Sequence, residues 1–503
     1  MRFRWRYLLV VVALAAGSLL VVACEEEEGE ETPTATPTAA ATGTPKATVT
    51  GTLAAATATR TVVTTATPTT APTIAPTTPP TAEVAVTPTT APTTPPTAEV
   101  AVTPTTAPTT PPTAEVTVTP TPVVFGPGIT DTEIILGADA PLSGAMGAVY
   151  ATIPQATEAY FKYVNDTQGG VCGRKIVYKV EDNQDDPGKG RQVVRKLVEE
   201  DKVFAIVGAL GDSPHPATWD YLNENGVPDI LVSVGAHMFG ADPEGHPWTV
   251  QMIASNRNEA LSFGQYISQN LPGKKVAVLI PNIIQGTDFL EGMKEGLDPD
   301  KNEIVSVQSF EMTAVSIGSQ VAKMKKDGAE VVTTVAAPGF SAQAIKEAGR
   351  LGWHPQWILS YINADEMMFQ FVWPPELMDG VISFQALKLA TWTDEPAVAE
   401  HHRIMREYDG PSPTNFTVYA QTLAEVAVEA LSRTCDDLTR QGLMDAVESI
   451  KDWHSDLFLD DVNISFSDTD HRAFETGHML RAVVENGKGR WEYFGPLWVL
   501  ESE

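Results

Sequence analysis

From about residue 129 onward, short apolar runs alternate with longer stretches in which apolar residues recur every three or four positions. The short runs are typical of buried β-strands, and the longer stretches are typical of amphipathic helices. Strands are predicted at 133–138, 176–181, 203–208, 230–234, 275–280, 303–310, 330–336 and 478–484. Helices are predicted at 150–165, 190–200, 217–225, 258–270, 288–297, 317–326 and 423–431. This order indicates an α/β fold of mostly parallel sheets covered by helices, with ligands bound at the carboxyl ends of the strands.

The first 24 residues have the pattern of an export signal. Three arginines form a basic head, an apolar run follows, and Ala23 precedes Cys24 and four glutamates. The ending resembles a bacterial lipobox, which implies that 1–23 is a lipoprotein signal peptide and that Cys24 carries lipid. The alternative is a plain transmembrane anchor, because the apolar run is near the lower length limit for crossing a bilayer. Either interpretation places the rest of the chain outside the cytoplasmic membrane and anchored to it.

Residues 24–128 are predicted to form a disordered stalk. They are mainly Thr, Pro, Ala and Val, and a 16-residue motif that begins at Ala75 recurs from Ala91 and, slightly altered, from Ala107. This composition buries too little apolar surface to offset chain entropy, and no repeat has a hydrophobic face that could stack into a solenoid. The proline spacing favours extended polyproline II, so we expect a spacer, open to O-glycosylation, beneath a folded region.

The folded region of roughly 370 residues is long enough for two lobes. The whole chain of 503 residues has 34 basic and 64 acidic side chains, a formal net charge of −30. Such a charge repels phosphate backbones and argues against a nucleic-acid partner. One of the 3 cysteines, Cys24, belongs to the lipobox. Cys172 and Cys435 remain, either as a disulfide in an oxidising compartment or as two buried thiols.

The folded region resembles the bacterial solute-binding receptors of the Leu/Ile/Val-binding protein family, which have the type I periplasmic binding fold. The resembling segments are APLSG at 140–144, GGVCGRKI at 169–176, EDNQDDP at 181–187, YLNENGVP at 221–228, AGRLGWHP at 348–355 and DLTR at 437–440. Their order and spacing extend from Ile129 to Leu500. The resemblance implies two Rossmann-like lobes joined by a three-strand hinge. It also implies a monomeric receptor, without cofactor or chemistry of its own, that delivers a small solute to ABC permease subunits.

In this family the chain crosses between the lobes three times, which implies crossings near Ser255, Gln385 and Phe466. The resulting lobe one is 129–254 with 386–464, and lobe two is 255–385 with 465–503. Such a hinge lets a ligand bind one lobe before the other closes over it. The family also places the helix ends before Cys172 and Cys435 on the side of lobe one away from the cleft, where a disulfide between them would lie.

Loops that follow the strands are expected to line the cleft. The ligand-binding residues implied by family position are Ser143, Asp212, Ser213, Gly235, Ala236 and His237 from lobe one, Gln285, Phe340, Ser360 and Tyr361 from lobe two, and Phe416 and Tyr419 from the returning segment. Small residues in such loops let backbone N–H groups approach a ligand, although Gly and Ser are also ordinary turn residues.

The chain departs from the family pattern where amino acids are recognised. Family members place a hydroxyl near the position of Asp212, and a carboxylate there repels a ligand carboxylate and attracts a cation. Amino-acid binders also use an acid from lobe two, whereas the matching stretch at 360–363 has none before Asp365. Gln285 stands where the family often has an aromatic residue. We therefore expect a small polar solute, amino-acid-like or amine, with the amine favoured by Asp212.

An enzyme is the weaker alternative, and no metal site is expected. His401 and His402 are adjacent rather than four residues apart, and the sequence contains neither a Gly-x-Ser-x-Gly elbow nor a Walker loop. His215 and His237, near the expected cleft, are interpreted as loop or hydrogen-bonding residues. A receptor of the same fold that signals to a membrane partner, instead of feeding a permease, stays open because only the partner distinguishes the two.

Overall fold

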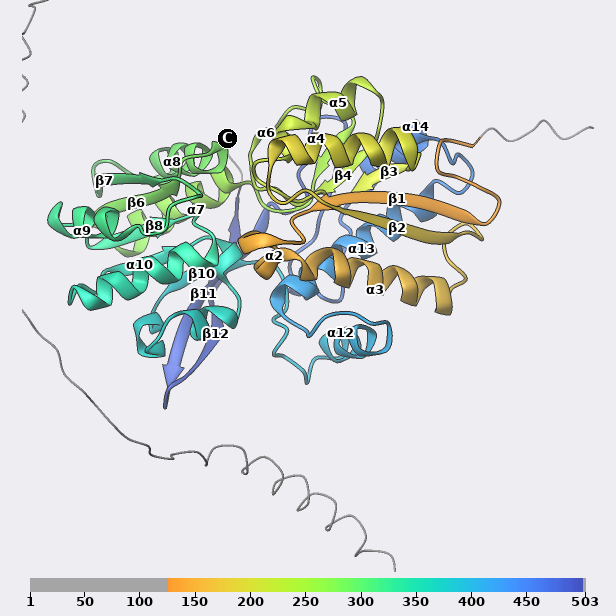
Figure 1. Cartoon of the computed structure of the whole chain (residues 1–503). Helices are drawn as coiled ribbons and strands as arrows, with labels where there is room; N and C mark the ends of the chain where they lie inside the picture. The colour runs from red at the N-terminus through yellow and green to blue at the C-terminus, as the bar shows by residue number, and fades with distance from the viewer. Residues whose placement is uncertain (1–124, 501–503) are drawn as a thin grey trace, which may run out of the picture. The chain divides into compact units, whose positions relative to one another are not determined.

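The computed structural model describes residues 125–500, shown as ribbons in Figure 1. The predicted signal peptide, Cys24 and all but the last few residues of the stalk lie outside the described residues. The described part has two halves, each built around one β-sheet (Figure 1). The half with the first sheet is called lobe one here, and the half with the second sheet is called lobe two.

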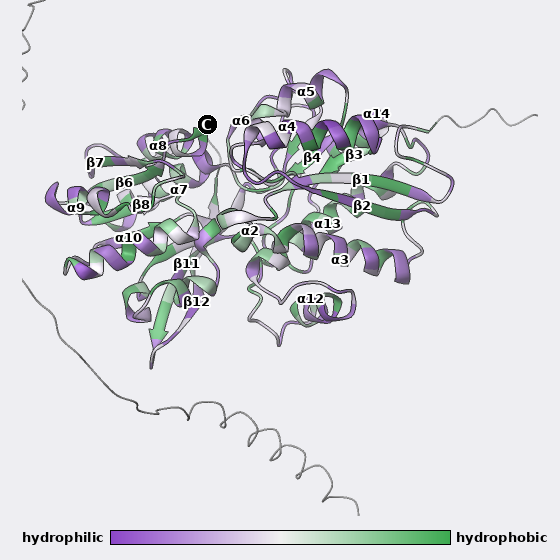
Figure 2. Ribbon diagram, viewed as in Figure 1, coloured by the Kyte–Doolittle hydropathy of each residue, from purple (hydrophilic) through white to green (hydrophobic). Residues whose placement is uncertain are grey.

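Lobe one is built on a five-stranded sheet whose strands are all parallel. The strands are β1 (Glu133–Ala140), β2 (Lys175–Asp182), β3 (Ala205–Val207), β4 (Asp229–Val232) and β5 (Thr249–Gln251). Their order across the sheet is β2-β1-β3-β4-β5, so the winding direction reverses between β1 and β3. Every residue of β3 and β4 is buried, as expected for strands covered on both faces, and both strands carry the hydrophobic colour in Figure 2.

The helices of lobe one come from two distant parts of the chain. They are α2 (Gly144–Tyr150), α3 (Thr152–Thr167), α4 (Pro187–Arg195), α5 (Trp219–Glu224), α6 (Met238–Ala241), α12 (Pro396–Glu407), α13 (Asn415–Arg433) and α14 (Arg440–Glu448). A π-helical turn, Lys196–Glu200, extends α4, and a 3-10 turn lies at His215–Ala217. Helix α13 packs against α3 and α14. It begins at a capping box formed by Thr414 and Thr417, which satisfies amides that the first turn leaves free.

Lobe two is built on a seven-stranded sheet of order β12-β11-β10-β9-β8-β6-β7. The strands are β6 (Lys275–Pro281), β7 (Glu303–Phe310), β8 (Val331–Thr334), β9 (Gln356–Leu359), β10 (Ile382–Gln385), β11 (Thr476–Glu485) and β12 (Lys488–Val499). The neighbours from β7 to β10 pair in parallel, whereas β11 is antiparallel to both β10 and β12. The predicted α/β class, with two mostly parallel sheets, is therefore confirmed.

The helices of lobe two are α7 (Asn256–Asn270), α8 (Ile284–Gly296), α9 (Gly318–Lys326), α10 (Pro338–Arg350) and α11 (Met367–Phe371), with 3-10 turns at Tyr361–Asn363 and Pro375–Met378. Helices α7 and α8 lie very close together because glycines stand at their contact. A Cβ at Gly296 would be 1.9 Å from the carbonyl oxygen of Leu261, and a Cβ at Gly292 would be 1.9 Å from that of Arg257. None of the helices within 125–500 has both the length and the apolar character needed to cross a bilayer.

The last strand of lobe two was not predicted. The expected strand at 478–484 is β11, and β12 follows it in a hairpin whose turn is Asn486-Gly487. Both turn residues have positive φ angles, 52° and 74°, as a type I′ hairpin turn requires. The Asn-Gly pair was a usable sequence signal, but β12 is mostly half-buried or exposed and lacks the apolar run of the central strands.

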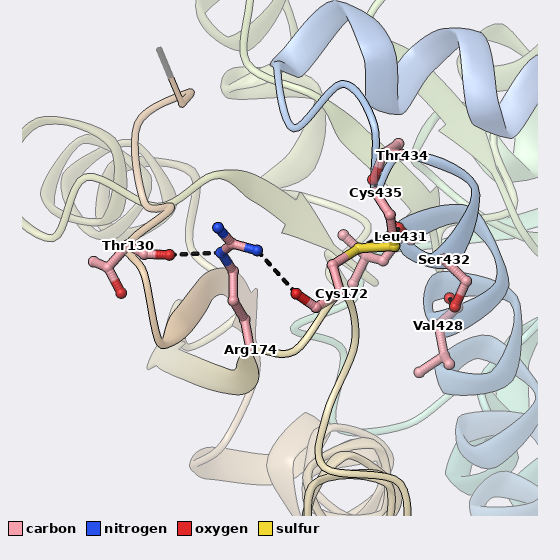
Figure 3. Close-up of a disulfide and its surroundings, with 8 residues drawn as sticks. All are labelled: Thr130, Cys172, Arg174, Val428, Leu431, Ser432, Thr434 and Cys435. Carbon is pink, nitrogen blue, oxygen red and sulfur yellow. Dashed lines mark hydrogen bonds between the residues drawn. A yellow bond between two sulfur atoms is a disulfide. The ribbon is translucent and has the colours of Figure 1, made fainter. Parts of the chain in front are cut away.

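Cys172 and Cys435 form a disulfide, with 2.08 Å between the sulfur atoms (Figure 3). Cys172 lies in the turn after α3, and Cys435 lies just beyond the end of α13. The bond joins the two separate segments that build lobe one, 263 positions apart in the sequence. Beside it, Arg174 donates hydrogen bonds to the carbonyl oxygens of Cys172 and Thr130, which fastens this turn to the segment before β1 (Figure 3).

Candidate functional site

A cavity of about 120 Å³ lies between the two lobes and is lined by residues of both. Its walls are largely the loops that follow parallel strands in each sheet, including those after β1 and β3 in lobe one and after β6 and β8 in lobe two. These pairs of strands flank the points where the winding direction of each sheet reverses. Open α/β sheets bind ligands at such points because the loops diverge there and leave a crevice.

Half of the predicted ligand-binding residues line this cavity: Asp212, Gly235, Gln285, Tyr361, Phe416 and Tyr419. The Tyr419 hydroxyl lies 2.7 Å from Oγ of Ser233, which also faces the cavity. The Tyr361 hydroxyl donates to the carbonyl oxygen of Ala254 at 3.0 Å and so ties a lobe-two loop to the chain leaving lobe one. These bonds fix the directions of two aromatic side chains at the wall.

The other predicted ligand-binding residues lie outside this cavity: Ser143, Ser213, Ala236, His237, Phe340 and Ser360. Ser143 is exposed, and its hydroxyl donates to Oδ2 of Asp182 at 2.6 Å. The amide of Ser213 donates to Oδ1 of Asp185 at 3.5 Å. Phe340 is partly buried and packs against the core of the second sheet, where its ring centroid is 4.6 Å from that of Phe310. Family position indicated the loops but did not indicate where each side chain points.

Ala236 and Ser360 are fully buried, and His237 bridges the lobes through its backbone. The amide of His237 donates to Oδ2 of Asp288 on α8 at 2.7 Å, and the ring Nδ1 lies 2.9 Å from Oγ of Ser255. Burial lowers the pKa of His237, and nearby arginines add to the effect. His237 therefore stabilises the approach of α8 to lobe one without facing the cavity.

The loop that carries Asp212 owes its shape to Gly211. Gly211 has a φ of 141°, and a Cβ there would lie 2.4 Å from Cγ of Pro214. The side-chain amide of Asn183 donates to the carbonyl oxygen of Leu210 at 2.7 Å and holds the preceding residue. A larger residue than glycine would push this loop away from Pro214, so Gly211 sets the position of Asp212 at the cavity wall.

Asp212 contacts lobe two directly. Its Oδ1 accepts a hydrogen bond from Nε2 of Gln285, in the first turn of α8, at 2.5 Å. Burial, and to a smaller extent the nearby Asp185 carboxylate, raises the pKa of Asp212 to about 7 against the opposing effect of the bond from Gln285. Burial also raises the pKa of Asp185, which lines the same wall. The cavity thus has two acidic groups close enough to disfavour each other's ionised form.

Sequence reasoning did not identify Tyr150, Asp185, Ser233, Asn256 and Asp365, all of which line the cavity. Asp185 belongs to the segment 181–187, which resembles the family. It follows β2, the strand that pairs with β1, and this position could have indicated that Asp185 lines the cavity. Tyr150 was assigned to a helix, and it packs edge-on against Phe416.

Asp365 is already engaged by backbone amides. Its Oδ1 accepts from the amide of Met367 and its Oδ2 from the amide of Asn415, each at 2.9 Å. Burial raises the pKa of Asp365, and these bonds oppose the shift. The carboxylate therefore joins lobe two to the start of α13 and has little capacity left for a ligand.

The other histidines considered from the sequence lie away from the cavity. His215 is buried in lobe one with Nε2 3.2 Å from Oδ2 of Asp229, and the Asp229 carboxylate raises the pKa of His215 against the effect of burial. His401 lies between Gln421 and Thr417, 2.8 Å from each, and burial lowers its pKa to about 4. Across residues 125–500, no group of three or more His, Cys, Asp and Glu side chains is placed to hold a metal ion.

The two sheets and the cavity at their strand ends define a two-lobed protein of the type I periplasmic binding fold. Residues 133–488 match the family model described as "Periplasmic binding protein", and the match covers more than half of the chain. The chain therefore belongs to the periplasmic binding protein family.

Individual relatives are distant. Leu/Ile/Val-binding protein homolog 3 of Brucella melitensis is 26% identical over 200 residues, which is 40% of this chain and 53% of the relative. The chain spans about half the length of the curated relatives it matches. A branched chain amino acid ABC transporter from Thermus thermophilus with bound valine has a TM-score of 0.64 at 18% identity, covering 73% of this chain and 98% of that one. A fatty acid ABC transporter substrate-binding protein from Thermomonospora curvata has a TM-score of 0.64 at 22% identity, covering 74% and 95%.

Proposed function

We propose that the chain is an extracytoplasmic receptor, anchored through lipid on Cys24, that captures a small polar solute between its lobes and delivers it to ABC permease subunits. The observation that carries this proposal is the cavity between the lobes, bridged at its wall by the bond from Gln285 to Asp212. Because each lobe supplies part of the wall, the site is complete only when the lobes are together. Closure of this kind is how two-lobed proteins enclose a ligand.

The moving bodies expected from the sequence are 129–254 with 386–464 and 255–385 with 465–503, and the same division is proposed here except at the last crossing. In support, the chain passes from the first sheet to α7 after β5 and leaves the second sheet after β10. On its last return it stays beside β5 as far as Ala473, whose amide donates to the carbonyl oxygen of Gln251 at 3.1 Å. This contact supports a third crossing between Ala473 and Thr476, so that 465–473 would move with lobe one.

Two of the relatives support an amino-acid-like solute, whereas the amine alternative rests on Asp212. The Thermus structure contains valine, and the Brucella relative is named for leucine, isoleucine and valine. The Thermomonospora relative, with the same fold, is named for fatty acids. The lobes of this fold thus accept solutes of different chemistry, and the side chains at the cavity wall decide which solute binds.

Mass spectrometry of small molecules released from the purified full chain tests the proposal. We expect one solute class in near-stoichiometric amount. Ile362→Trp, which fills the cavity from its wall, should abolish the release, whereas Val315→Trp, at a side chain that is 93% exposed and outside the cavity, should not. Equal release from both variants would show that the solute binds elsewhere.

Lipid anchoring has a separate test, because it rests on the sequence before the described residues. Cys24→Ala should abolish lipid labelling and release the protein from the membrane fraction. A Cys24→Ala protein that stays firmly in the membrane fraction would instead support the transmembrane-anchor alternative.

A further inference from the structure

The charged side chains that line the cavity are all acidic. Asp185 and Asp212 lie on the lobe-one wall and Asp365 on the lobe-two wall, and none of the lining residues within 125–500 is Lys, Arg or His. Asp365 is satisfied by backbone amides, but Asp185 and Asp212 face each other's charge without a cation among the lining residues. A ligand carboxylate would enter a negative potential without a counter-charge, which is costly in a buried site.

A second observation at the same place points to a hydrogen-bond donor. Gln285 is only 3% exposed, and no donor among the described residues reaches its Oε1. Its Nε2 is already used by Asp212, so the free atom is an acceptor at the cavity wall. A buried acceptor without a partner costs free energy until a donor is supplied. A ligand N–H group beside Asp212 would supply that donor.

The remainder of the wall is mainly apolar. Met146, Ile153, Ile253, Met312, Val335 and Phe384 all line the cavity. Its volume of about 120 Å³ is of the same order as the ~150 Å³ apolar cavity that accommodates benzene. The body of the ligand must therefore be small and hydrocarbon-like, because polar groups along it would lack partners at these side chains.

We propose that the cavity binds a small apolar amine without a carboxylate, with its ammonium group held by Asp212, Asp185 and Oε1 of Gln285. The inference rests on the proposed function as a solute receptor and narrows the substrate class of that same cavity. The ammonium group neutralises the acidic end of the site and satisfies the free acceptor, and the hydrocarbon part fills the apolar remainder. A carboxylate on the same ligand would gain neither contact.

Protonation of the acidic end gives the site a pH dependence. The titratable groups that face Asp212 are Asp185, Tyr150 and Tyr361, and burial raises the pKa of each. With its own pKa at about 7, Asp212 is largely protonated below that pH in the unliganded protein. An ammonium group favours the ionised form, so the amine should bind more tightly as the pH rises from about 6 to about 8.

Three ligands with the same branched hydrocarbon chain test whether the cavity selects an amine, an amino acid or a carboxylate: isoamylamine, leucine and 4-methylpentanoate. Titration calorimetry on the full chain, freed of co-purified solute, should show isoamylamine binding at least tenfold more tightly than the other two. Equal or tighter binding of leucine or 4-methylpentanoate would overturn the inference and leave the proposed receptor function intact. Binding of none of the three would also overturn it, and the mass-spectrometric test would still decide the receptor function.

Variants locate the contact. Asp212→Asn and Asp185→Asn keep the side-chain shape and remove the charge, and each should weaken isoamylamine binding by at least tenfold. Asp131→Asn, at an exposed position outside the cavity, should leave it unchanged. Thermal unfolding shows whether each variant is folded. If a variant is unfolded, the pH dependence of isoamylamine binding to the unaltered protein still tests the ammonium contact. Unchanged affinity in both cavity variants, or affinity that does not rise with pH, would contradict the proposed ammonium contact.

Discussion

Gln285 of α8 donates a hydrogen bond across the cleft to the Asp212 carboxylate in the loop after β3, with 2.5 Å between Nε2 and Oδ1. Asp288, one turn further along α8, accepts a second inter-lobe bond from the amide of His237 at 2.7 Å. Both contacts join the first half of α8 to loops that follow strands of lobe one. Helix α8 is therefore held to lobe one at two points, one of which is the acidic wall of the cavity.

Removing the bond between Gln285 and Asp212 should favour opening of the lobes. Hydrogen bonds to charged groups contribute about 1.5–3 kcal/mol, and a loss of about 1.4 kcal/mol already changes an equilibrium constant tenfold. Gln285→Leu should therefore raise the exchange rate of amide hydrogens in 209–213 and 235–238 by about tenfold or more. Hydrogen–deuterium exchange of the unliganded protein measures this. Gln308→Leu, in β7 of the same lobe and outside the cavity, is the matched control. Unchanged exchange in Gln285→Leu would mean that this bond does not hold the lobes together.

Glu259 should make the stability of the protein depend on pH. It is fully buried in the first turn of α7, its Oε1 accepts from the amide of Tyr361 at 2.6 Å, and burial raises its pKa from 4.5 to about 8 against that bond. Between these two values the folded state binds more protons than the unfolded chain, so this group's contribution to the free energy of unfolding falls as the pH rises.

The expected result for Glu259→Gln is a flatter pH dependence, because glutamine is neutral throughout. Urea unfolding at about pH 5 and about pH 8 gives the two free energies, and their difference should shrink by a few kcal/mol relative to the unaltered protein. The exposed Glu303→Gln should leave the difference as it is. If the free energy of unfolding varied with pH in the same way in Glu259→Gln and in the unaltered protein, Glu259 would not be the source of this pH dependence.

Contact between α7 and α8 should not tolerate a methyl group at Gly296. The added Cβ would lie 1.9 Å from the carbonyl oxygen of Leu261, so the helices must separate. Overpacking of this kind costs about 1–3 kcal/mol, and we expect Gly296→Ala to lower the free energy of unfolding by that amount. Gly339 in α10 is the control, because a Cβ there meets nothing within 4 Å. Gly339→Ala should be neutral or stabilise by up to about 1 kcal/mol, since alanine loses less backbone entropy.

Loss of the Cys172–Cys435 disulfide should destabilise lobe one. The bond closes a loop with a sequence separation of 263, and the chain-entropy treatment assigns such a loop about 4–5 kcal/mol, less any strain. Replacing both cysteines by serine should lower the free energy of unfolding by about this amount, and reduction of the unaltered protein should have the same effect. Titration of two free thiols in the unfolded, non-reduced mature protein would show that the bond does not form.

The sequence by itself determined the class of the fold. Strand β7, a partly exposed edge strand, coincides with the range predicted for it, and most other predicted strands match within a few residues. Central strands such as β3 and β6 are buried on both faces, which imposes continuous apolar runs that survive in any packing. The position of the site at strand ends followed from the same order of elements. The family resemblance correctly indicated the fold, and its expected loops do contribute to the cavity.

Only the tertiary structure decided which side chains meet. Asp185 and Asp212 are far apart along the chain, and Gln285 is 73 positions beyond Asp212, yet all three line one cavity. Phe340 was expected at the wall and instead is partly buried against the core of the second sheet. Hydrophobic periodicity records which residues are buried, but side chains in loops have no such period. Their direction is set by the packing of two lobes whose segments alternate along the chain, and that packing is where the specificity of the cavity arises.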